Sequence, residues 1–155
     1  MMEVQAKGQK LLMITGIIYI VVGALAALGG IIGVMGVVAI PHMDAQTLQI
    51  MEAQWASQGM TMEDATGTAV IMTLVIAAIA GVLSVVAGIM GVVNRNKPAK
   101  AQVCIIMGAI ILTLDMATAG YAISQGTFLW WSTSFSAILA VCYLYGGILN
   151  KQSAK

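Results

Sequence analysis

The sequence predicts an all-α fold: an integral membrane four-helix bundle with a short extracellular amphipathic helix between the first two spans. The first observation is composition, because 60% of the 155 residues are hydrophobic and only 8% are charged, with a mean hydropathy of +0.96. The second is that most of the chain falls into four apolar stretches, each long enough to provide the roughly 20 residues that cross a bilayer. This composition excludes a soluble globular domain.

The predicted spans make the whole chain, residues 1–155, a single membrane domain. Their limits are residues 11–40, 65–93, 101–123 and 128–149. A polar outer segment, residues 41–64, joins the first two spans, and a short cytoplasmic loop, residues 94–100, joins the second to the third. Because so little of the chain lies outside the spans, we expect no soluble catalytic module.

The placement of charge predicts the orientation. All seven basic residues lie near a chain end or in the 94–100 loop: Lys7, Lys10, Arg95, Lys97, Lys100, Lys151 and Lys155. Four of the six acids lie in the outer segment with no Lys or Arg among them: Asp44, Glu52, Glu63 and Asp64. Basic flanks remain in the cytoplasm during insertion. We therefore expect a multi-pass protein of the cell membrane, a bacterial inner membrane, with both termini cytoplasmic.

The outer segment carries a helical pattern. Leu48, Met51 and Trp55 share one face at i, i+3 and i+7, with polar side chains elsewhere. We expect this apolar face to lie on the headgroups or on the neighbouring spans. Gly59 is a candidate C-cap, and the run Thr61–Asp64 has the form of a capping box that starts the second long helix near Met62.

Small residues form stripes on the first two spans. Gly16, Gly23 and Gly30 recur every seven residues, and the second span carries a similar stripe that includes Gly81, Gly88 and Gly91. Small residues let helix backbones approach closely in lipid. Two interpretations stay open: the two helices pack on each other through these stripes, or the stripes form the seam of a homo-oligomer.

Asp115 is the one acidic or basic residue inside a predicted span. It lies about 14 residues, or roughly 21 Å, above the inner end of its helix. A charge at such a position costs about 2.5–3.5 kcal/mol on insertion scales, so these residues usually face the bundle interior. At the same depth the fourth span presents Ser132 and Ser136 on one face. A neutral Asp115 bonded to these hydroxyls, a proton- or ion-handling site, and exposure to a lumen or partner helix all remain possible.

The sequence contains no recognisable catalytic or metal-binding set. His42 is the only histidine, and Cys104 and Cys142 form no Cys-x-x-Cys motif. We find no phosphate-binding loop, zinc-protease motif or paired carboxylates. We therefore expect no catalytic activity, no metal and no cofactor. The basic residues are juxtamembrane anchors, so we expect the lipid bilayer, and not nucleic acid, as a partner.

The stretch Gly88–Gly108 contains Gly-x-x-Gly, then Asn-x-Asn-Lys-Pro-x-Lys, then Cys-Ile-x-x-Gly. In this region the chain resembles the uncharacterised small four-span membrane proteins of Gram-positive bacteria, a resemblance that implies no activity. From the residues themselves we expect a non-catalytic protein that acts by helix–helix or outer-loop contact, as an accessory subunit, an immunity-type protein or an oligomeric scaffold. The alternative is a small oligomeric channel or a proton- or ion-coupled transporter that uses Asp115.

Overall fold

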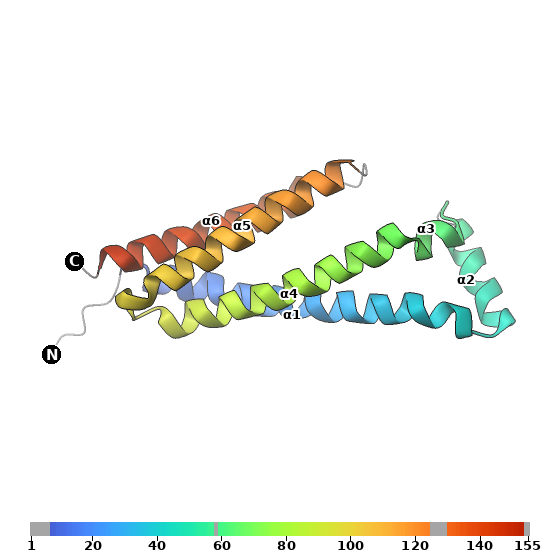
Figure 1. Ribbon diagram of the computed structural model, residues 1–155, viewed down its shortest axis with the longest axis horizontal. Coiled ribbons are helices and arrows are strands. Elements are labelled where there is room, and N and C mark those ends of the chain that lie inside the picture. Colours follow the sequence, from blue (N-terminus) through green and yellow to red (C-terminus); the bar gives the residue numbers. More distant parts are fainter. Residues whose placement is uncertain (1–6, 58, 125–129, 154–155) are drawn as a thin grey trace. The chain divides into compact units, whose positions relative to one another are not determined.

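The computed structural model describes residues 7–57, 59–124 and 130–153, and within these residues every regular element is helical (Figure 1). The elements in chain order are α1 (Gln9–Ala39), the 3₁₀ turn η1 (Ile40–His42), α2 (Ala45–Ser57), α3 (Met62–Thr66), α4 (Thr68–Asn94), the 3₁₀ turn η2 (Pro98–Lys100), α5 (Ala101–Ser124) and α6 (Trp130–Gln152). The predicted all-α class is confirmed.

In the described part of the chain, four helical runs are long and apolar enough to cross a membrane: Gln9–His42, Met62–Asn94, Pro98–Ser124 and Thr133–Gln152. They correspond to the four predicted spans, except that residues 128–129 at the start of the fourth lie outside the described residues. Pro41 sits in η1, directly after α1, where the missing backbone N–H prevents the α-helix from continuing.

The second long helix differs from the expectation in one respect, because it is divided at Gly67 into α3 and α4. Gly67 has an extended backbone, with φ −61° and ψ 159°. A Cβ atom on this residue would lie 2.7 Å from the carbonyl oxygen of Glu63, so a larger residue would require the backbone to shift at this bend. The predicted capping box is present at Thr61 and Asp64, and α3 begins at Met62.

The chain divides into two compact units: Met1–Ala24 together with Val82–Lys155, called unit 1, and Leu25–Gly81, called unit 2. The helices α1 and α4 contribute residues to both. In unit 1, α5 and α6 lie side by side along most of their length (Figure 1). The buried core of unit 1 comprises Leu12, Tyr19, Ala87, Cys104, Ile111, Leu139, Ala140 and Tyr143.

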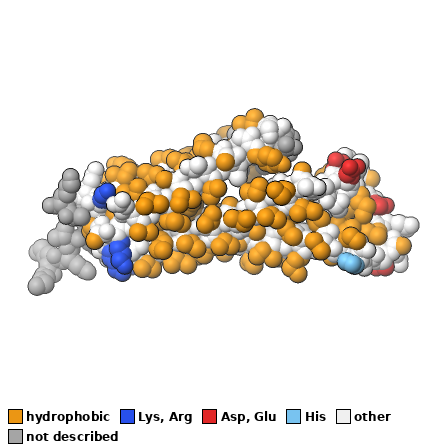
Figure 2. All heavy atoms as spheres, viewed as in Figure 1, with side chains coloured by type: hydrophobic (Ala, Val, Ile, Leu, Met, Phe, Trp, Pro, Cys, Tyr) orange, Lys and Arg blue, Asp and Glu red, His pale blue; other side chains and the backbone are white. Residues whose placement is uncertain are grey.

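Tyr143 is the centre of this core. Its hydroxyl donates a 2.6 Å hydrogen bond to the carbonyl oxygen of Ala87, and its ring meets Tyr19 edge to face with centroids 5.5 Å apart. At the start of the 94–100 loop, the side-chain amide of Asn150 donates to the carbonyl oxygen of Asn94 at 3.1 Å. These hydrogen bonds connect α6 to α4. In Figure 2 the Lys and Arg side chains lie at one end of unit 1.

In unit 2, the second half of α1 packs closely against the first half of α4. A Cβ atom on Gly30 would lie 2.6 Å from the carbonyl oxygen of Leu74. Beyond this pair the chain continues through η1, α2 and α3, and Figure 2 shows the acidic side chains over this part of unit 2. Large apolar side chains are exposed on α1, among them Leu25 (67%), Ile32 (65%) and Met35 (66%).

Candidate functional site

The first candidate site is a polar pair between α5 and α6. The hydroxyl of Ser136 donates a 2.7 Å hydrogen bond to Oδ2 of Asp115, and both residues are half-buried. Gly108, two helical turns before Asp115, brings α5 close to α6, since a Cβ atom there would lie 3.1 Å from Tyr143 Cδ1. Small residues on one face of α5 thus set the approach that lets Asp115 reach the neighbouring helix.

Two of the three residues expected in this site are brought together. Ser132 belongs to α6, but its side chain lies outside the described part of the chain. Ser136 is therefore the partner that the structure identifies for Asp115.

Tyr19 is a buried polar side chain of the same unit that sequence analysis did not identify. Its side chain is 4% exposed, and within the described residues its hydroxyl has no hydrogen-bond partner. Tyr19 shares the buried core of unit 1 with Ile111, which lies one helical turn before Asp115 on α5. A sequence signal did exist, because Tyr19 lies well inside a predicted span, whereas tyrosines of membrane proteins concentrate near the interfaces.

The polar region has limited chemical capacity. A carboxyl group, a hydroxyl and a phenol can hold a proton, a water molecule or a monovalent cation, but they provide no nucleophile activated by a base. No group of three or more His, Cys, Asp or Glu side chains with metal-binding geometry occurs in the described ranges.

The glycine stripes lie in helix contacts within each unit. In unit 1, a Cβ atom on Gly88 would lie 2.5 Å from the carbonyl oxygen of Gly16, and one on Gly91 would lie 2.6 Å from Tyr143 Cε2. In unit 2, Gly30 meets Leu74 and Ala78. Gly23 and Gly81 are buried as well. These glycines thus lie where helices of the same chain pack together, as the first of the two interpretations predicts.

The second candidate site is built around α2. Leu48, Met51 and Trp55 are half-buried, whereas every other residue of α2 is exposed. The helix ends in a Schellman motif: Gly59, with φ +74°, donates to Ala56, and Met60 donates to Trp55 at 3.0 Å. The helix is therefore held by its apolar stripe, and its polar face remains free.

Asp44 caps the start of α2. The backbone N–H of Thr47 donates a 2.8 Å hydrogen bond to Oδ1 of Asp44, and the Thr47 hydroxyl donates to Oδ2 at the same distance. Of these two, the backbone hydrogen bond contributes more to lowering the pKa of the Asp44 carboxyl below its ordinary value. Asp44 therefore carries a negative charge at neutral pH.

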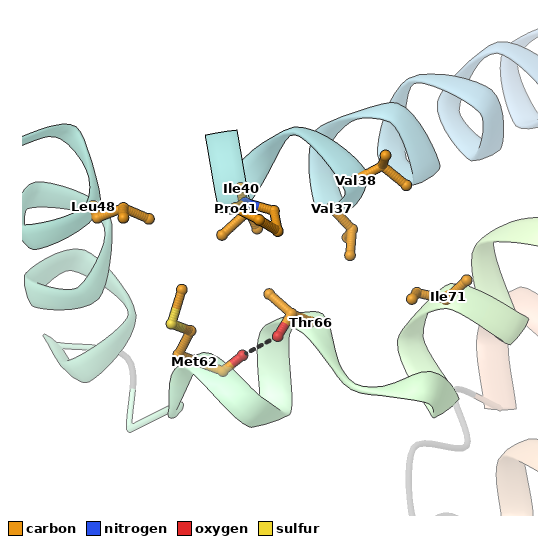
Figure 3. A pocket seen from close by; sticks show the side chains of 8 residues that line it. All are labelled: Val37, Val38, Ile40, Pro41, Leu48, Met62, Thr66 and Ile71. Atoms are coloured by element: carbon orange, nitrogen blue, oxygen red, sulfur yellow. Dashed lines mark hydrogen bonds between the residues drawn. The ribbon is translucent and has the colours of Figure 1, made fainter. Parts of the chain in front are cut away.

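An apolar pocket of about 420 Å³ lies within unit 2 (Figure 3). Side chains from α1, η1, α2, α3 and α4 line it: Val37, Val38, Ile40, Pro41, Leu48, Met62, Thr66 and Ile71. The only hydroxyl among them, that of Thr66, donates to the carbonyl oxygen of Met62 at 2.8 Å. The pocket therefore presents an almost wholly apolar lining.

Comparison of the chain with protein-family models, with curated proteins and with solved structures finds no match. The resemblance of Gly88–Gly108 to small four-span proteins consequently stays a prediction.

Proposed function

We propose that this chain is a non-catalytic multi-pass protein of the cell membrane that acts by contact with a partner, as an accessory subunit, an immunity-type protein or an oligomeric scaffold. Four long apolar helices and the exposed Leu25, Ile32 and Met35 side chains support a lipid environment, because a soluble surface rarely carries so many large apolar groups. The positions of the basic residues support cytoplasmic termini.

The observation that carries the contact proposal is the division of α2 into two faces. Its apolar stripe is half-buried and its other residues are exposed, with Glu52 beside Leu48 around the helix and Gln54 on the opposite side from Glu52. Residues 25–81 contain four acids and no Lys or Arg. No Lys or Arg within this segment therefore neutralises these acids. An ordered helix with an unneutralised polar face fits an interaction surface on the outer side of the membrane.

Site-specific photocrosslinking in intact cells tests this proposal. A photoreactive amino acid at Gln54, on the polar face, should give a discrete protein adduct, and the same position in the Glu52→Gln background should give less of it. The matched control is Ile79, which is 57% exposed on α4 and should yield lipid adducts. An adduct with a second copy of the chain would identify the scaffold form. Lipid adducts alone at both positions would refute contact through α2.

A second candidate function is supported by the polar region of unit 1. Asp115 bonds to Ser136, and the buried Tyr19 hydroxyl lacks a partner within the described residues. Ionisable groups within membrane helices often mark ion or proton pathways. On this alternative the protein is a small oligomeric channel or ion-coupled transporter. Reconstituted liposomes should then show a proton or cation flux that Asp115→Asn abolishes, and an equal flux in the variant would exclude a role for Asp115 titration.

A further inference from the structure

The lining of the pocket in unit 2 defines what can enter it. Its volume of about 420 Å³ falls within the roughly 300–1,000 Å³ typical of ligand pockets. Aliphatic side chains, Pro41 and Met62 form almost all of the lining, and the Thr66 hydroxyl is engaged by the Met62 carbonyl oxygen (Figure 3). A polar group would lose its hydration here without gaining a partner. The inserted part of any occupant is therefore apolar.

Carboxylates flank the pocket residues along the chain. Asp44 and Glu52 stand one helical turn before and one turn after Leu48, and Glu63 directly follows Met62. All three acids are exposed, and residues 25–81 contain no Lys or Arg. The segments that contribute Leu48 and Met62 to the lining therefore carry acids and no Lys or Arg, a charge that attracts cations and repels anionic headgroups.

Together these features point to one class of occupant. We propose that the pocket receives the apolar face of a cationic amphipathic peptide segment, whose Lys or Arg side chains pair with Asp44, Glu52 and Glu63. A free inorganic cation leaves the apolar lining unused, and a neutral acyl chain leaves the carboxylates unused. A helix that places apolar anchors in a groove and charges on its rim satisfies both. This inference rests on the proposed contact function of α2 and names the partner's chemistry.

Peptide binding to the full chain in nanodiscs of zwitterionic lipid tests the inference. The probe is a labelled amphipathic helical peptide of Leu and Lys, and its match has the same pattern with Glu in place of Lys. After subtraction of binding to empty nanodiscs, the Leu/Lys peptide should bind saturably and more weakly as salt rises, because exposed charges are screened. The Leu/Glu peptide should not bind. Equal binding of both peptides would overturn the inference.

One double variant tests the acids, and one matched pair of variants tests the pocket. Glu52→Gln with Glu63→Gln should weaken binding about threefold to tenfold, as expected for two exposed ion pairs. Leu48→Trp fills the pocket and should weaken binding at least as much, whereas Ile50→Trp, at a 63% exposed position outside the lining, should not. Because the two glutamine substitutions change only exposed side chains, the test survives if Leu48→Trp disturbs folding.

The other possible outcomes also test the inference. Unchanged affinity in the glutamine double variant would mean an apolar occupant such as lipid, and loss of a protein dimer in Leu48→Trp would mean that a second copy fills the pocket; either result overturns the inference. If a partner is crosslinked at Gln54 but the peptide does not bind, the inference of a cationic peptide is refuted and the proposed contact through α2 is retained. Saturable peptide binding without any cellular adduct refutes the proposed partner contact in cells and retains the pocket's specificity.

Discussion

At the scale of single residues, the hydrogen bond between Asp115 and Ser136 gives a carboxyl group in an apolar helix a defined partner. Hydrogen bonds between membrane helices contribute modestly, about 0.6 kcal/mol on average and at most about 1.7 kcal/mol in double-mutant cycles. The energetic role of the pair is thus small compared with the cost of leaving the carboxyl group without any partner.

A double-mutant cycle measures this contribution. Asp115→Ala and Ser136→Ala should show a coupling of about 0.6 kcal/mol in reversible unfolding in detergent micelles. Thr113→Ala is the matched control for Ser136, because the Thr113 hydroxyl donates to the Ala109 carbonyl oxygen of its own helix. A coupling as large between Asp115 and Thr113 would show that the cycle reports a general change in α5 and not this bond.

The approach of α1 to α4 within unit 1 gives a second prediction. Gly88→Ala should destabilise the protein by about 1–3 kcal/mol, because the new methyl group meets the carbonyl oxygen of Gly16 at 2.5 Å and backbone must move. Gly29→Ala is the same change on α1 with no atom within 4 Å. It should leave stability unchanged or raise it by up to about 1 kcal/mol. Equal effects in thermal unfolding would contradict the packing of this glycine pair.

Sequence reasoning reached part of the polar region for a clear physical reason. Helix rise fixes depth, so counting residues along two spans pairs Asp115 with the Ser132–Ser136 stretch. Counting does not reveal which helices are neighbours or which side chains meet in the core. Tyr19 lies on α1, and its contact with Tyr143 depends on tertiary packing. This contact was therefore beyond prediction from the sequence.

At the scale of elements, the capping box decides where α3 begins. Thr61 accepts a hydrogen bond from the Asp64 N–H, and Asp64 accepts one from the Thr61 N–H at 2.9 Å. Removing the cap with Thr61→Ala should lower hydrogen-exchange protection in the first turn of α3 about fivefold. Amides in the middle of α5 serve as the internal control. Loss of protection throughout the chain would mean that the cap governs global stability instead.

The cap of α2 predicts a pH dependence with a definite sign. Hydrogen bonds from Thr47 hold the pKa of Asp44 below its ordinary value of 3.8, so the capping contribution is present above that pH and is lost as pH falls through the folded-state pKa. The amide resonance of Thr47 should titrate with a midpoint below 3.8. Asp44→Asn, which still caps, should remove the titration. A midpoint above 3.8 would contradict the bond.

Helix boundaries followed the sequence where a side chain enforces them. Pro41 follows α1, Thr61 opens α3 and Gly59 closes α2, each through local chemistry readable from one residue. The bend at Gly67 was not predicted, because an isolated glycine inside an apolar run is also compatible with an unbroken helix. The structure shows that this bend leaves little room for a side chain, because a Cβ atom on Gly67 would lie 2.7 Å from the carbonyl oxygen of Glu63.

At the scale of the whole molecule, the pattern of charge along the chain predicts orientation independently of how the two units pack. Every Lys and Arg lies near a terminus or in the loop between α4 and α5, and the segment between α1 and α4 contains four acids and no Lys or Arg. Lys and Arg in short loops resist translocation. The chain should therefore insert with α2 and α3 on the outer side.

Cysteine labelling in intact cells tests this orientation. Ser57 at the end of α2 and Asn96 in the basic loop are both exposed, so a cysteine at either position is accessible to reagent on its own side of the membrane. Ser57→Cys should react with a membrane-impermeant maleimide in intact cells, and Asn96→Cys should react only after permeabilisation. The unmodified chain is the control, because Cys104 is buried and Cys142 half-buried. The reverse labelling would place the acidic segment in the cytoplasm, and an external partner for α2 would then be excluded.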